Sequence, residues 1–201
     1  MKTAADRDLH PKDRLLRTAS RLFYAEGIHA VGVDRLVTEA SVTRATFYRH
    51  FPTKDHLVAA YLAESSRGIR EAVRATRRER PAREALMDVM AIIGDATRAE
   101  DFRGCQFLNA AAEYPDPAHP VRVVIDEHRK WFFEVLREQA EAVGHPDPEH
   151  AARVLVLLRD GALQGGELDD PETVRETLRR AVEDVLPTAP ASTTRQPREG
   201  R

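Results

Sequence analysis

The stretch SVTRATFYRHFPTKDHL, residues 41–57, decides the fold because it gathers aromatic and basic side chains directly after a short helical segment and a turn. On a helix that advances about 100° per residue, Phe47 and Phe51 share one side. The polar side chains between them, including Tyr48 and Arg49, fall on the other sides. The pattern predicts that the phenylalanines pack against neighbouring helices and that the polar face is presented to a partner.

The rest of the chain is typical of an all-helical protein. Apolar residues recur at helical spacing in segment after segment, and the sustained alternation typical of strands is missing. We therefore predict an all-α fold of about nine helices, with Thr43 capping the third and Pro171 opening the ninth. The expected ranges are about 11–26, 33–40, 43–51, 54–80, 81 onward, 104–113, 121–143, 149–165 and 171–186.

Composition limits the classes of partner. The 201 residues carry a formal charge of only −2, so the chain as a whole has no charge excess that would attract nucleic acid. Residues 1–56 differ, because ten Lys and Arg there face seven Asp and Glu, a formal +3 that leaves −5 for the rest. We predict a DNA-binding domain over 1–56, a ligand-binding and dimerisation domain over 57–186, and a disordered tail over 187–201.

Cysteine usage and hydropathy indicate the compartment. Cys105 is the single cysteine, so no intramolecular disulfide can form, which is typical of a reducing environment. The longest purely apolar run, 154–158, is far too short to cross a bilayer. We predict a cytoplasmic protein with no membrane partner.

The polar face of the third predicted helix suits the surroundings of a DNA duplex. A helix-turn-helix places the outward face of its second helix in the major groove. There Arg44 or Arg49 can pair with guanine, and small Ala45 lets the backbone approach the bases. Hydroxyl, imidazole and ammonium groups hold phosphates. The candidate DNA-binding residues are Thr43, Arg44, Ala45, Thr46, Tyr48, Arg49, His50 and Lys54. The alternative is an ordinary helix with a core side and a solvated side.

The order of residues here resembles the DNA-binding domain of the TetR family of bacterial transcriptional regulators, over residues 14–62. The matching features are Leu15 to Phe23, Glu26-Gly27, Val33 to Leu36, Ala40, Val42-Thr43, Thr46 to Phe51, Lys54-Asp55 and Leu57. The resemblance implies groove or base contacts for Arg44, Ala45, Tyr48 and Arg49. It also implies phosphate contacts for Thr46, His50 and Lys54.

Two positions depart from the family pattern. Gly32 stands where the family usually has a Ser or Thr that caps the second helix and touches phosphate, so that contact is expected to be lost. Ser41 stands where the family usually has the glycine of the turn, which predicts a slightly different turn.

The segment AARVLVLLRDGAL, residues 151–163, is apolar nearly all round and must be covered on more than one side. One cover is the domain's own core, and the other is the same helix of a second copy. The residues predicted to form this dimer interface are Val154, Leu157, Leu158, Leu178, Val182 and Val185. Burial within a single chain is the alternative.

A small-molecule effector is predicted to bind inside the C-terminal domain. Such molecules are held in apolar pockets with few polar groups, so we expect a largely apolar effector. The candidate ligand-binding residues are Met90, Cys105, Phe107, His128, Trp131, Phe132 and Arg159. The alternative is that these residues form core without a pocket.

No pattern indicates an enzyme, a cofactor or a metal. Cys105 and His128 lack the third residue that frames a catalytic pair, and His145, Asp147 and His150 are explained by loop and cap positions. We predict a one-component regulator, a homodimeric repressor that binds a palindromic operator and releases it on binding an effector. The alternatives are an effector-independent architectural DNA-binding protein and a redox sensor or enzyme built on Cys105.

Overall fold

The computed structural model describes residues 9–187 except residue 79, and this part of the chain is all-α. Its elements are α1 (Pro11–Glu26), α2 (Val33–Glu39), α3 (Arg44–His50), α4 (Lys54–Arg77), α5 (Ala82–Ala96), α6 (Gln106–Glu113), α7 (Pro120–Ala142), α8 (Pro148–Gly165) and α9 (Pro171–Val185). The prediction of about nine helices is confirmed, and the predicted disordered tail lies, apart from Pro187, outside the described residues. No described helix is long and apolar enough to cross a membrane.

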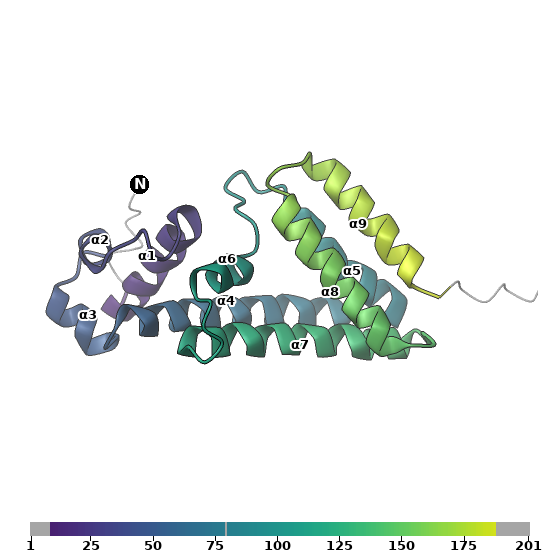
Figure 1. Cartoon of the computed structure of the whole chain (residues 1–201), viewed down its shortest axis with the longest axis horizontal. Coiled ribbons are helices and arrows are strands. Elements are labelled where there is room, and N and C mark those ends of the chain that lie inside the picture. Colours follow the sequence, from purple (N-terminus) through teal and green to yellow (C-terminus); the bar gives the residue numbers. More distant parts are fainter. Residues whose placement is uncertain (1–8, 79, 188–201) are drawn as a thin grey trace, which may run out of the picture.

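The helices form two groups joined by α4, as Figure 1 shows. The first three helices gather round the N-terminal end of α4, and α5, α8 and α9 lie toward its other end. The long helix α7 runs beside α4, and the short helix α6 lies between the two groups. The predicted domain boundary at residue 56 falls inside α4, so one continuous helix links the two groups.

Apolar side chains of the first three helices meet in a small core. Leu15, Leu22, Leu36 and Phe47 are fully buried, and the rings of Phe47 and Phe51 lie 6.3 Å apart. Complete burial of such side chains stabilises the fold by about 1.5–3 kcal/mol each. The expected packing role of the two phenylalanines is confirmed, and this packing fixes which side of α3 faces outward.

The C-terminal helix packs against its own chain more closely than the sequence predicted. Helix α9 lies on α5, where Gly94 leaves room for the backbone of Arg175. Leu178 and Val182 are buried within the chain and present almost no surface to a second copy. Their predicted place at a dimer interface is therefore not supported, because α9 packs on α5 and α8 of its own chain.

Helix α8 retains an apolar outer strip. Leu157 is 67% exposed, Val154 and Leu158 are partly exposed, and Gly161 has open space beside it. Val185 on α9 is also partly exposed. Three of the exposed or partly exposed predicted residues, Val154, Leu157 and Leu158, lie on α8, so the interface hypothesis is centred on this helix.

Candidate nucleic-acid interface and the cavities behind it

Helix α3 presents the polar face that the sequence predicted. The Thr43 hydroxyl oxygen accepts a hydrogen bond from the Thr46 N–H at 3.1 Å and so caps the helix. Arg44, Ala45 and Arg49 are exposed, and Tyr48 is 48% exposed. Ala45 is small, and the guanidinium groups of Arg44 and Arg49 and the Tyr48 phenol are exposed on the same helix. This surface can enter the major groove of DNA.

The turn before α3 is fixed by an arginine of α1. Arg14 donates from Nε to the Ala40 carbonyl at 3.0 Å and from Nη2 to the Ser41 carbonyl at 3.2 Å. Ser41 has φ of 53°, the left-handed conformation that favours glycine. The turn therefore keeps a glycine-type backbone with serine in place. Gly32 makes no side-chain cap bond to α2, as expected for that position.

Arg44 is held by a neighbouring helix. Its Nε donates to the Asp34 carboxylate of α2 at 2.7 Å, and its Nη2 bonds the same oxygen. Both side chains are exposed, and such ion pairs are weak in water and in salt. Asp34 therefore orients Arg44 at the edge of the polar face and can release it to a phosphate or base.

Two predicted phosphate contacts are less exposed than expected. His50 packs edge-on against His10 with ring centroids 5.3 Å apart, its Nε2 is buried, and burial is the main cause that lowers its pKa. Lys54 places its ammonium 5.9 Å from the Phe23 ring centroid, and burial lowers its pKa although Glu113 and Asp55 oppose this. Neither side chain faces outward as freely as Tyr48 or Arg49.

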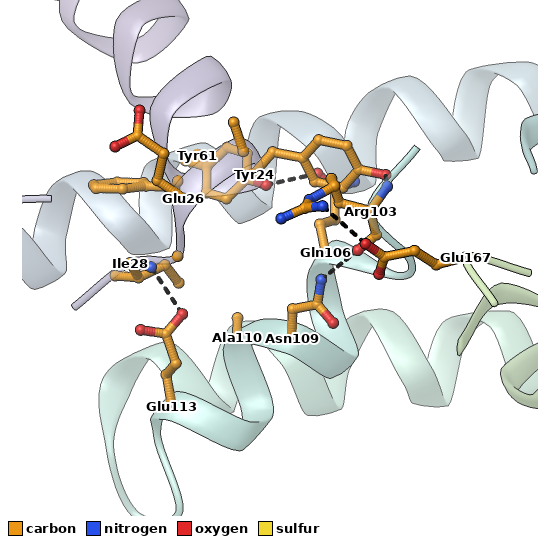
Figure 2. A pocket seen from close by; sticks show the side chains of 13 residues that line it. Tyr24, Glu26, Ile28, Tyr61, Arg103, Gln106, Asn109, Ala110, Glu113 and Glu167 are labelled. Atoms are coloured by element: carbon orange, nitrogen blue, oxygen red, sulfur yellow. Dashed lines mark hydrogen bonds and ion pairs between the residues drawn. The ribbon is translucent and has the colours of Figure 1, made fainter. Parts of the chain in front are cut away.

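A polar cavity of about 330 Å³ separates α1 from α6, at the junction of the two helix groups. Figure 2 shows Glu113 at the end of α6 reaching toward the loop after α1. Its carboxylate accepts hydrogen bonds from the N–H of Ile28 at 2.8 Å and of His29 at 2.6 Å. Gly27, with φ of 90°, makes the turn that aims these two N–H groups at it.

Three tyrosines add links across the same junction. Tyr24 of α1 donates to the Gly104 carbonyl at 3.0 Å and accepts from the Arg103 N–H at 2.9 Å. Tyr61 of α4 donates to the Gln106 side chain at 2.9 Å. Tyr114 donates to the Asp55 carboxylate at 2.9 Å. Burial is the main cause that raises the pKa of all three phenols, so they remain protonated donors at neutral pH.

A second cavity, of about 240 Å³, lies among α6, α7 and α8. Four of the predicted ligand-binding residues line it: Phe107, His128, Phe132 and Arg159. The rings of Phe107 and His128 are stacked, with centroids 3.8 Å apart. The sequence thus predicted much of the lining, although it could not predict that a space remains between these side chains.

The other three candidates do not line this cavity. Cys105 is buried, and its Sγ accepts from Arg159 Nη2 at 3.3 Å. Trp131 lies beside His128 with centroids 5.5 Å apart, and the Arg70 guanidinium covers its ring. Met90 is 2% exposed and is core.

Burial makes His128 a neutral imidazole. Burial first, then the charges of Arg159 and Arg70, lowers its pKa to about 3. Its Nδ1 lies 3.0 Å from Ser66 Oγ, which also accepts from Arg70 Nε at 3.2 Å. Among the described residues, nothing bonds His128 Nε2.

The histidine-rich loop before α8 has a structural role. The His145 Nδ1 accepts from the Asp147 N–H, and the Asp147 carboxylate accepts from the His150 N–H to cap α8. In the part of the chain that the structure describes, no three His, Cys, Asp or Glu side chains are grouped to hold a metal ion.

Comparison with known proteins agrees with this architecture. Residues 15–61 match the family described as bacterial regulatory proteins, tetR family. Over 87% of the chain and 93% of the other protein, the structure superposes with a TM-score of 0.84 and 53% identity on SCO4454, a TetR-family transcriptional regulator from Streptomyces coelicolor. The chain belongs to the TetR family.

Two further relatives support the same placement within the TetR family. A putative TetR transcriptional regulator (sav143) from Streptomyces avermitilis is 31% identical, with a TM-score of 0.77 over 88% of this chain and 98% of that one. The transcriptional activator FasR of Mycolicibacterium smegmatis is 35% identical over 161 residues, 75% of this chain and 70% of FasR. This TetR-family protein is thus a transcriptional regulator, and its relatives are regulators rather than enzymes.

The sequence did not reveal the residues that join the two groups of this TetR-family regulator. Glu113 and Tyr114 stand at the end of a short helix, where a carboxylate and a phenol usually face solvent. Their partners lie far away in the chain, at residues 28, 29 and 55. The one available signal was their position just before a proline-rich loop.

Proposed function

We propose that this TetR-family regulator is a homodimeric repressor that binds a palindromic operator through α3 of each copy. A small molecule in the C-terminal domain releases the operator. The observation that carries the proposal is the division of α3. Phe47 is fully buried in the three-helix core, while Arg44, Ala45, Tyr48 and Arg49 are exposed together.

Two copies of α3 are needed to read a palindrome. Half-sites contacted in this way lie one duplex turn apart, about 34–36 Å. The apolar outer strip of α8, with Val154, Leu157 and Leu158, supports dimerisation. The outer face of a helix that meets only solvent is usually polar, whereas an exposed apolar strip is typical of a contact surface. The dimer would then set the distance between the two recognition helices.

Helix α6 provides a physical route from the effector to the DNA. Phe107 lines the 240 Å³ cavity, and Glu113 holds the loop after α1. An occupant that moves α6 changes this hold, and with it the position of α1 and α3 relative to α4. This is a population shift between two arrangements, driven by the difference in effector affinity for them.

The test is selection of bound sequences from random duplex DNA by the full chain. The expected product is an inverted repeat bound by two copies, with affinity that falls steeply as salt rises. Recovery of no preferred sequence, or of an asymmetric site bound by one copy, would overturn the proposal.

Activation is a second candidate, favoured by the 35% identity to FasR, which is described as a transcriptional activator. The two outcomes separate in transcription from a promoter that carries the selected site. Addition of the regulator lowers transcript yield if it represses and raises it if it activates.

A further inference from the structure

The cavity among α6, α7 and α8 is lined by both apolar and charged side chains. Phe107, Ile125, Phe132 and Val156 supply apolar walls. Arg122, Arg129 and Arg159 also line it, with Asp126 and Asp160. Three cations against two carboxylates leave a formal excess of one positive charge around the cavity.

Two hydrogen-bond donors at this cavity lack partners. Among the described residues, nothing bonds the buried Nε2 of His128 or the buried Nε of Arg122. His128 is 2% exposed, so bulk water does not satisfy it. A buried polar atom without a partner is unfavourable, which favours an occupant that bonds it.

The surrounding bonds define what the two atoms offer. Ser66 Oγ accepts from Arg70 Nε, so its hydroxyl proton is free for His128 Nδ1. The imidazole proton is then on Nε2, which makes that atom a donor. The Nε of Arg122 is a donor in every state. An occupant that bonds these two atoms must therefore supply acceptor atoms such as oxygen.

The two carboxylates at the cavity are already neutralised. Asp160 pairs with both Arg159 and Arg129, each at 2.7 Å, and Asp126 lies 3.6 Å from Arg122. Because both carboxylates already have arginine partners, a cationic ligand is not needed to neutralise them. The positive charge that remains in excess at the cavity belongs to an arginine.

We propose that this cavity binds a small monocarboxylate that has a single ring as its apolar body. The carboxylate oxygen atoms accept from His128 Nε2 and Arg122, and the ring lies among Phe107, Phe132 and Ile125. A cavity of about 150 Å³ holds benzene, so about 240 Å³ suits one ring with a short acidic substituent. This inference rests on the proposed function, because it names the chemical class of the effector.

Calorimetric titration of the full chain with benzoate, phenylacetate, and the neutral analogues benzamide and toluene tests the proposal. At least one of the two acids binds with one site per chain, and its own neutral analogue binds at least tenfold more weakly. Arg122→Met and His128→Phe each weaken the acid at least tenfold. Arg153→Met removes an exposed charge of α8 outside this cavity and leaves binding unchanged.

His128→Phe keeps a ring against Phe107 but loses the bond to Ser66, so its fold is checked by circular dichroism and melting temperature. If it does not fold, the binding measured with Arg122→Met tests the proposal, because the Arg122 side chain is 24% exposed and its replacement disturbs the core less. Absence of binding by both acids overturns the ligand class, as does equal binding of an acid and its neutral analogue, or binding that the folded variants leave unchanged.

Operator binding is measured separately with the selected duplex. An acid that binds the cavity without releasing the duplex supports the ligand class and contradicts the effector role. If the chain binds the acid but no specific duplex, the proposed function is contradicted and the proposed ligand class is not.

Discussion

Phe107 and Glu113 stand at opposite ends of α6, about 9 Å apart along the helix axis, and each contacts a different part of the molecule. Phe107 stacks on His128 at the cavity among α6, α7 and α8, and Glu113 accepts hydrogen bonds from the N–H groups of Ile28 and His29 after α1. A short helix with fixed contacts at both ends moves as a unit. A displacement of α6 at Phe107 should therefore also move Glu113.

The Glu113→Gln substitution tests this contact. An amide is neutral and has one acceptor oxygen, so Ile28 and His29 can no longer each bond a separate charged oxygen. A bond to a charged group contributes about 1.5–3 kcal/mol, so hydrogen exchange of the Ile28 and His29 amides should become at least tenfold faster. Glu167→Gln is the matched control, since Glu167 lines the same cavity but pairs with the Arg103 side chain. Unchanged exchange in Glu113→Gln contradicts the role of the carboxylate.

The Arg49→Ala substitution tests the polar face of α3. Loss of a guanidinium that reads a base costs about 1–3 kcal/mol on the preferred duplex and little on random DNA. Tyr48→Ala, by contrast, should weaken binding to both duplexes by similar factors, because a phenol suits phosphate. Fluorescence anisotropy with the two duplexes distinguishes them. Equal losses on both duplexes for Arg49→Ala would assign that residue to the backbone of the DNA.

The helices and the outward face of α3 could be predicted because local periodicity and caps determine them. Thr43 caps α3 as expected, and Phe47 and Phe51 are buried. What the sequence could not predict depends on contacts between distant residues. Leu178 has the same period whether it meets α5 or a second copy, and Glu113 shows no local sign of its partners. The cavity beside His128 depends on how three helices pack, which spacing does not determine.

The Leu157→Glu substitution tests the outer strip of α8. A carboxylate in an apolar contact between copies lacks a partner and destabilises it, so sedimentation should show monomers that keep their helical content. Val123→Glu is a control on an exposed apolar residue of α7. Val182→Glu should instead unfold the chain, because Val182 is fully buried within it. A dimer that survives Leu157→Glu moves the interface elsewhere.

The Ser41→Gly substitution tests the backbone conformation of the turn by comparison with Ser41→Ala, since both variants lose the serine side chain. A residue other than glycine in the left-handed region costs about 1–2 kcal/mol, whereas the added freedom of glycine in the unfolded chain costs about 0.5–1 kcal/mol. Ser41→Gly should therefore be more stable than Ser41→Ala by about 1 kcal/mol or less, seen as a higher urea midpoint with the same slope. A lower midpoint for Ser41→Gly than for Ser41→Ala would contradict the cost assigned to the left-handed backbone of Ser41.

The last prediction concerns acid, through His128. Burial lowers its pKa in the folded chain to about 3, whereas the unfolded chain has the ordinary value of about 6.5. Between these values the unfolded state binds a proton that the folded state does not, so stability falls as pH falls through this window and is unaffected above it.

The slope is about 1.4 kcal/mol per pH unit, which amounts to about 2 kcal/mol between pH 6.5 and pH 5. Urea unfolding at a series of pH values measures it. His128→Phe has no group to titrate at this position, so its free energy of unfolding should decline less between pH 6.5 and pH 5 by about that amount. Parallel curves for the wild type and His128→Phe would contradict the lowered pKa of His128. They would show that the imidazole binds its proton equally well in the folded and unfolded chain.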